Sequence, residues 1–337
     1  MSLSTTGWTW SHGGFPKALK QTQINLGNAS LGKHEVLIRV KAAALNPVDV
    51  QLMSLPLLAY VPNFILRPNK GTGCDFAGVI EQAGPASSFQ VGDEVLGVIF
   101  PFPEGTLQEV IRLDTSKSSN VIIPKPRDWS WEQAAALPLV WLTAHTALAK
   151  VEQVVKGKEI KVAVLGGSSA SGMYIVHQAK QRGWTVVASC SAEKADFVRG
   201  MGADETIDYR TTSVSGRLKE MKPDAIVDCV GGTECLGIAK RYVTLVGDKT
   251  DRADLGGSGT YLLHPRMMLR TLRGLVGLGE SYICIDFLLE SSWLEDLPTL
   301  PKDKIVIDST FGFDQVEQAY TRLNSGRTKG KVVISME

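Results

Sequence analysis

One short segment limits the possible folds of this chain more than any other part of it. An apolar run at residues 161–165 leads directly into the small residues 166–172, Gly-Gly-Ser-Ser-Ala-Ser-Gly, and a helical pattern follows at 173–182. A buried strand that ends in small residues before a helix directs backbone N–H groups and the positive helix end toward one point. That point suits a pyrophosphate. The expected phosphate-binding residues are Gly167, Ser168, Ser169, Ala170 and Ser171.

The segment departs from the Gly-x-Gly-x-x-Gly pattern at one position, because Ser169 stands where the middle glycine is expected. A serine still offers its amide N–H, and its hydroxyl adds a donor. Gly172 keeps the last glycine of the pattern, which lets the helix pack closely on the strand. The alternative is an ordinary turn between a strand and a helix that happens to be rich in Gly and Ser. The strands that follow favour the nucleotide-binding interpretation.

One part of the sequence is rich in short strand candidates and another alternates strands with helices, which indicates two domains. Two domains are also the expectation for a chain of 337 residues. Short strand candidates at 36–40, 79–81, 95–99 and 121–123 lie among Gly and Pro residues and indicate a small barrel-like domain. From residue 131 a helical run begins, which Pro138 is expected to kink or divide, and strands and helices then alternate. Such alternation produces a parallel sheet covered on both faces. A helix at 314–324 and a strand at 331–334 follow.

The expected fold class is therefore α/β, with a β-rich domain built from both chain ends and a doubly wound, parallel-sheet domain inserted into it. We place the β-rich domain at residues 1–127 plus 281–337 and the nucleotide-binding domain at residues 128–280.

Composition excludes several classes of partner. The formal net charge is +1, which gives no electrostatic reason to expect nucleic acid or an anionic membrane. No apolar run approaches the roughly 18 residues of a membrane span. The first 30 residues contain no Arg and no apolar core of a signal peptide. The five cysteines are scattered and odd in number, which fits reduced thiols. We expect a cytoplasmic protein.

The strand at 185–188 bears on the choice of nicotinamide cofactor. NAD-selective sites place a carboxylate near the end of this strand, and here Ser-Cys-Ser follows instead. Ser191 could donate to a 2′-phosphate and Lys194 could neutralise it, and Tyr209 with Arg210 forms a second candidate clamp. The alternative for Lys194 is a solvated helix residue, and Glu193 weakens the argument slightly. A pocket without a repelling carboxylate favours NADPH.

Six further segments, in order along the chain, resemble the medium-chain dehydrogenase/reductase superfamily. They are residues 43–49, 73–80, 91–97, 105–110, 134–144 and 330–333. The likeness is to its zinc-independent branch of quinone oxidoreductases and enoyl reductases. It implies a GroES-like catalytic domain around an inserted Rossmann domain.

The resemblance also implies site residues. Asn46 and Thr143 fall where relatives approach the nicotinamide, and the remaining implied cofactor contacts are Val230, Gly247, Leu278 and Lys331. Tyr60 lies in the loop where enoyl reductases of this branch have a proton-donating tyrosine, although packing within an apolar loop explains it equally well. Tyr282 is a second candidate for binding substrate. Relatives commonly form homodimers, which leaves a homodimer open here.

The same resemblance makes metal binding testable. The catalytic zinc of alcohol dehydrogenases needs Cys and His ligands, whereas this chain has Asn46 at the first ligand position and Gly73-Cys74-Asp75 at the second. Residues 84–114 contain no Cys for a structural zinc. We expect no metal, and Cys74 as a small buried thiol.

Without zinc, the substrate must itself accept hydride, as quinones and α,β-unsaturated carbonyl compounds do. The expected partner is a small hydrophobic quinone or carbonyl compound, reduced by NADPH. Because no acid or base stands out, a second hypothesis remains: a protein that binds NADPH for a structural or partner-binding role with little or no catalytic activity.

Overall fold

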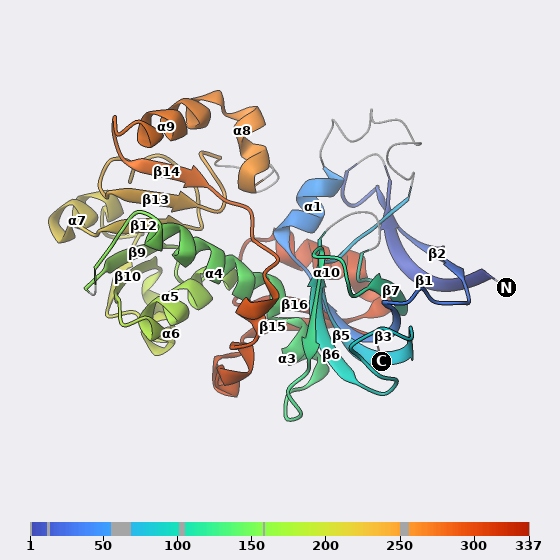
Figure 1. Cartoon of the computed structure of the whole chain (residues 1–337). Coiled ribbons are helices and arrows are strands. Elements are labelled where there is room, and N and C mark those ends of the chain that lie inside the picture. The colour runs from blue at the N-terminus through green and yellow to red at the C-terminus, as the bar shows by residue number, and fades with distance from the viewer. Residues whose placement is uncertain are drawn as a thin grey trace. The chain divides into compact units, whose positions relative to one another are not determined.

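A mixed sheet and a parallel sheet form the cores of two separate units of the chain (Figure 1). The computed structural model describes residues 2–11, 14–54, 69–100, 105–157, 159–249 and 256–336. The first unit comprises Met1–Leu139 and Leu289–Glu337, and the second comprises Val140–Leu288. The two sheets confirm the expected fold class of each unit. We call the first unit the GroES-like unit and the second the Rossmann unit.

The GroES-like unit contains a seven-stranded sheet of order β15-β16-β3-β5-β6-β8, with β7 also paired to β3. The C-terminal strand β16 pairs antiparallel with β3, so the two ends of the chain share one sheet. Alternate residues of β3, namely Val36, Ile38 and Val40, enter the hydrophobic core, as the period of a half-buried strand requires. The strands predicted from the sequence fall within β3, β5, β6, β8 and β16.

The bounds of the strands in this unit are β1 (Ser2–Trp10), β2 (Leu19–Asn28), β3 (Glu35–Ala44), β4 (Lys70–Gly71), β5 (Asp75–Ala83), β6 (Glu94–Ile99), β7 (Val110–Asp114), β8 (Asn120–Pro124), β15 (Ile307–Gly312) and β16 (Lys331–Ser335). Its helices are α1 (Pro47–Met53), α3 (Trp131–Ala135) and α10 (Val316–Asn324), with short 3-10 turns at Ser291–Leu294, Leu297–Thr299, Lys302–Lys304 and Phe313–Gln315. A second sheet, of order β2-β1-β4, was not predicted.

The Rossmann unit is built on a six-stranded sheet of order β11-β10-β9-β12-β13-β14, in which every pairing is parallel. Its central strand β9 pairs with β10 on one side and with β12 on the other. The chain therefore reverses its direction of winding next to β9, which is where open sheets of this kind bind nucleotides.

Strand bounds here are β9 (Lys161–Leu165), β10 (Thr185–Cys190), β11 (Glu205–Asp208), β12 (Ala225–Asp228), β13 (Arg241–Thr244) and β14 (Ser281–Cys284). The helices are α4 (Pro138–Glu152), whose first two residues belong to the GroES-like unit, α5 (Ala170–Gln181), α6 (Ala195–Met201), α7 (Val214–Met221), α8 (Thr260–Leu263) and α9 (Pro265–Leu275). Two 3-10 turns lie at Ala192–Lys194 and Gly257–Gly259.

The unit boundaries differ from the predicted ones, 127/128 and 280/281. Helix α3 packs on β3, β5 and β16, which keeps residues 128–139 in the GroES-like unit. Strand β14 pairs with β13, which keeps residues 281–288 in the Rossmann unit. In both places the contacts of an element, rather than a change in composition, set the boundary.

Pro138 divides the first helical run as predicted, because α3 ends at Ala135 and α4 begins at Pro138. Together the stretch Trp131–Glu152 is long and apolar enough to cross a membrane by length and composition, which the count of uninterrupted apolar residues did not reveal. Its most apolar window is 89% buried within the fold. This burial is that of a helix in a protein core.

Candidate functional site

The loop between β9 and α5 has the form that the sequence predicted. Gly166 adopts a positive φ of 79°, a conformation that glycine permits at little cost. Ser169 is the N-cap of α5, and its hydroxyl accepts a hydrogen bond from the Gly172 amide at 3.0 Å. The intrahelical bonds begin with Met173 N donating to Ser169 O. The amides of Ala170 and Ser171 therefore have no acceptor within the helix and suit an anion.

Close packing explains which positions in this loop must lack a side chain. A Cβ at Gly172 would lie 2.2 Å from the Gly166 carbonyl oxygen, and a Cβ at Gly167 would lie 2.7 Å from the Ala188 Cβ. Ser169 has φ −73°, which any residue can adopt. The serine at the middle position is therefore compatible with the loop and supplies the helix cap.

Ser189 on β10 holds the same loop, and the sequence interpretation missed it. Its hydroxyl accepts from the Gly166 amide at 3.0 Å, and its carbonyl accepts from the Gly167 amide at 2.9 Å. The side chain is 93% buried. The only hint in the sequence was a hydroxyl residue near the end of the strand adjacent to the loop.

The ends of β10 and β11 bring together the residues expected at a 2′-phosphate. Ser191 is buried at the N-cap of the turn Ala192–Lys194, and Tyr209, after β11, is 56% exposed. The Arg210 guanidinium donates to Glu193 Oε1 at 2.7 Å and lies 5.9 Å from the centre of the Tyr209 ring. The negative charge of Glu193 thus has a partner, which removes the objection that it raised to a phosphate here.

Asp228, at the end of β12, organises the next two loops along the sheet edge. Its Oδ1 accepts from the amides of Val230 and Gly231, both at 2.9 Å. Its Oδ2 accepts from the Thr244 hydroxyl at 2.9 Å, and that hydroxyl accepts from the Gly247 amide at 2.9 Å. Burial raises the pKa of Asp228, against the lowering effect of the amide donors. Val230 and Gly247 thus lie at the expected edge, on loops fixed by two residues that were not predicted.

Two predicted site residues of the Rossmann unit need correction. Leu278 precedes β14 and so lies at the amino end of the sheet, whereas the phosphate loop lies at the carboxyl ends. Tyr282 lies within β14 and is 97% buried, with its ring stacked on Tyr242 at 5.7 Å. Tyr282 had been assigned to the GroES-like domain, whereas β14 belongs to the Rossmann sheet. Thr143 lies on α4 and is buried, and its contact with the nicotinamide stays a prediction.

A buried polar network occupies the GroES-like unit where the resemblance placed Asn46. Lys331 Nζ, on β16, donates to Asn46 Oδ1 at 2.5 Å and to Asp75 Oδ2 at 2.9 Å. Asn46 Nδ2 donates to the same Asp75 oxygen at 2.9 Å. None of the three residues is more than 3% exposed. The amide of Asn46 is therefore fixed in one orientation, and the predicted contacts of Asn46 and Lys331 with the cofactor stay predictions.

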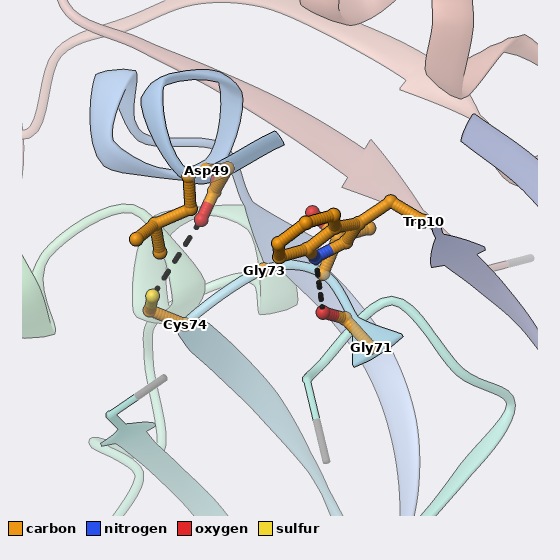
Figure 2. Close-up of a pocket in the computed structure, with 7 residues that line it drawn as sticks. Trp10, Asp49, Gly71, Gly73 and Cys74 are labelled. Carbon is orange, nitrogen blue, oxygen red and sulfur yellow. Dashed lines mark hydrogen bonds between the residues drawn. The ribbon is translucent and has the colours of Figure 1, made fainter. Parts of the chain in front are cut away.

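Asp49 forms a second layer of this network, beside a small cavity (Figure 2). Its Oδ2 accepts from the backbone amide of Asn46 at 2.8 Å, and the Cys74 thiol donates to its Oδ1 at 3.5 Å. Burial raises the pKa of Asp49 to about 7. The cavity, of about 10 Å³, is lined also by Trp10 and Thr72 and has room for one water molecule.

Cys74 is buried, as predicted, and burial and the nearby carboxylates raise the pKa of its thiol. Among the residues that the structure describes, no group of three His, Cys, Asp or Glu side chains could hold a metal ion. Tyr60, the predicted proton donor, lies outside the described residues.

A parallel sheet with a phosphate loop at its switch point, joined in one chain to a GroES-like unit, defines a class of dinucleotide-binding oxidoreductases. Family models agree: residues 32–121 match the alcohol dehydrogenase GroES-like domain, and residues 201–334 match a domain described as zinc-binding dehydrogenase. The chain belongs to the medium-chain dehydrogenase/reductase superfamily, whose enzymes work with a nicotinamide cofactor.

Individual relatives cover most of the chain. The NAD(P)H oxidoreductase RTN4IP1, mitochondrial, of Mus musculus is 33% identical over 331 residues, which span 90% of this chain and 82% of that protein. The trans-enoyl reductase pgmF of Aspergillus terreus is 32% identical, over 92% of this chain and 89% of that protein. The solved quinone oxidoreductase of Coxiella burnetii shares the fold, with a TM-score of 0.76 at 24% identity over 99% of this chain and 100% of that chain.

Proposed function

We propose that this protein is an NADPH-dependent oxidoreductase that transfers hydride to a quinone or an α,β-unsaturated carbonyl compound without zinc. The observation that carries the proposal is that Lys331 donates to both Asn46 and Asp75, which fall in the two segments expected to supply zinc ligands in zinc-dependent relatives. The partner would be a small hydrophobic molecule.

The chemistry of these side chains does not fit a zinc ion. An ammonium group already lies within hydrogen-bond distance of both Asn46 Oδ1 and Asp75 Oδ2, so a divalent cation there would meet a like charge. We therefore derive no step through zinc, although one matching family model carries a zinc-binding description.

The loop and helix α5 fit a dinucleotide. The amides of Ser168, Ala170 and Ser171 would bind the pyrophosphate, because those of Gly167 and Ser169 donate within the loop. Ser191 with Lys194 would bind a 2′-phosphate. No carboxylate ends β10, and Glu193 is paired with Arg210. These features support NADPH over NADH. Bound NADPH would supply the hydride, while the protein orients the reactants and excludes water.

The proposed zinc-independent reaction favours acceptors with their own electron-poor centre. The relatives' names include both a quinone oxidoreductase and a trans-enoyl reductase, so both acceptor classes belong in the proposal. Quinone reduction adds hydride to the quinone ring system. Enoyl reduction adds hydride at the β-carbon and a proton at the α-carbon.

The test is anaerobic mixing of the protein with NADPH, followed by a panel of quinones and enones. We expect loss of NADPH absorbance with at least one acceptor, faster than with NADH, and unchanged by a zinc chelator. Deuterium from labelled NADPH at the β-carbon of a saturated product identifies enoyl reduction. Tight NADPH binding with a flat absorbance trace across the whole panel would favour the structural or partner-binding role instead.

A further inference from the structure

Helix α9 and the turn after it expose an unusual amount of apolar surface. Among the described residues, twelve large hydrophobic side chains are exposed, and six of them lie within residues 268–278. The six are between 51% and 76% exposed: Met268, Leu269, Leu272, Leu275, Val276 and Leu278. Apolar residues concentrated in this way mark a binding surface, whereas scattered ones do not.

The opposite side of α9 is firmly attached to its own unit. Met267 is fully buried, and Arg270 pairs with Asp248 at 2.7 Å while lying 4.7 Å from the centre of the Tyr282 ring. Successive helix residues lie about 100° apart, so Met268, Leu272 and Leu275 face away from this attachment. The exposed apolar face is therefore the fixed outer side of a packed helix.

Helices α8 and α9 also cover the outer edge of the Rossmann sheet, along β14 (Figure 1). Ser281 and Ile285 direct their amides to β13, so the amides of Tyr282 and Cys284 point outward. The Cys284 amide donates to the Tyr261 hydroxyl at 3.0 Å. A Cβ at Gly274 would lie only 3.2 Å from the Tyr282 nitrogen, so α9 runs directly against this edge. A second copy of the chain therefore cannot extend the sheet by pairing with β14.

Charge identifies the occupant of the apolar face. Residues 265–279 contain three arginines, of which Arg270 is paired with Asp248, and no carboxylate. Arg266 and Arg273, two helical turns apart, are exposed along one flank of the apolar face. We propose that the outer face of α9 and the turn through Leu278 binds the surface of an anionic lipid membrane, with the apolar side chains entering the headgroup boundary and the arginines contacting lipid phosphates. The overall charge of +1 conceals this local excess.

Two other occupants agree less well with the same observations. A second copy would meet this face with its own, because a two-fold contact uses the same surface on both partners. Such a contact would bring Arg266 and Arg273 of both copies into one interface, without a carboxylate in the segment to offset them. A folded protein would need an apolar groove rimmed by carboxylates to receive the ridge that this helix and turn present, whereas a lipid surface accepts it directly.

The test uses the full chain and vesicles of phosphatidylcholine with or without phosphatidylserine, separated by flotation. We expect binding that requires phosphatidylserine and weakens with salt. The variant Leu272→Glu/Leu275→Glu should lower vesicle binding by about tenfold or more, since it places carboxylates in the apolar face. The variant Arg266→Gln/Arg273→Gln should reduce both the phosphatidylserine requirement and the salt dependence.

A matched control makes the same chemical change at exposed valines elsewhere. Val91→Glu/Val154→Glu, at side chains 69% and 42% exposed, should bind vesicles as the unmodified protein does. Thermal unfolding checks that every variant is folded. Failure of the unmodified protein to bind anionic vesicles would overturn the proposal, and so would equal binding by the leucine variant. Sedimentation showing a dimer that the leucine variant dissociates, without vesicle binding, would assign the face to a second copy and would also overturn it.

Discussion

At the scale of single residues, the buried ion pair of Lys331 and Asp75 has the clearest energetic consequence. Replacing one partner leaves the other charge buried and uncompensated, so we expect Lys331→Met to destabilise the chain by about 3–5 kcal/mol. The double variant Lys331→Met/Asp75→Asn should lose less than the sum of the single changes, because it removes both charges. Urea unfolding of the four proteins measures this. Additive losses would show that the two side chains do not interact.

Asp49 should give the stability of the protein a pH dependence of unusual sign. Burial raises its pKa from 3.8 in the unfolded chain to about 7 in the folded protein. Below both values each state holds the proton. As pH rises between them, the unfolded state ionises first, so stability falls by up to about 1.4 kcal/mol per pH unit, and the loss is complete above the folded pKa.

Asp49→Asn removes this titration and keeps an oxygen that can accept from the backbone amide of Asn46. We expect the stability of this variant, relative to the unmodified protein, to increase from pH 4 to pH 7 and then level off. Urea unfolding across that range measures the difference. A difference that stays constant with pH would contradict a raised pKa at Asp49.

Gly172 provides a prediction for the phosphate loop. Gly172→Ala puts a Cβ against the Gly166 carbonyl, so the loop must shift and NADPH binding should weaken by about tenfold or more. The matched control is Gly200→Ala on α6, where a Cβ would meet no atom within 4 Å. We expect that variant to bind NADPH normally and to gain about 0.5–1 kcal/mol in stability. Fluorescence titration with NADPH compares the two, and equal affinities would contradict the close approach.

At the scale of elements, the sequence predicted the strands β3, β5, β6, β8, β9, β10, β12, β13 and β16 and the helices α3, α4, α5, α6 and α10. It did not predict the other described strands, nor the helices α1, α7, α8 and α9. Strands such as Lys161–Leu165 are uniformly apolar because helices cover both faces of their sheet. In α9 the most regular apolar side faces outward, contrary to the assumption that apolar residues mark the core.

In the candidate site, too, some residues could be predicted from the sequence and others could not. The phosphate loop was predictable because backbone geometry demands small residues at fixed spacing. Ser189, Asp228 and Thr244 were not, because their roles depend on which strands become neighbours. Lys331 was expected as a cofactor contact, but its pairing with Asn46, 285 residues away in the chain, was not predicted.

The ends of β10 and β11 are expected to determine cofactor choice. Lys194→Ala should raise the KM for NADPH by about tenfold while changing the KM for NADH little, because only NADPH carries the 2′-phosphate. Steady-state kinetics with both cofactors and one acceptor measures the ratio. Lys219→Ala, at an exposed lysine on α7, is the control for loss of a positive charge. Equal effects on the two cofactors would argue against a 2′-phosphate contact.

At the scale of the whole molecule, one unit is continuous in sequence and the other is not. Residues 140–288 form a sheet with its own core, whereas the GroES-like unit needs β16 from the far end of the chain to pair with β3. We expect limited proteolysis to leave a resistant fragment close to residues 140–288, and NADPH to increase its resistance. Mass spectrometry of the fragments identifies it. Simultaneous loss of both units would show that they unfold together.

The covered edge of β14 has a consequence for how this protein can assemble. An open sheet edge is a template on which any extended chain can add a strand, whether in an ordered dimer or in an aggregate. Here Tyr261 and α9 occupy that template from within the same unit. No further strand can be added to the sheet at β14. Any partner that binds on this side must therefore be recognised through side chains alone.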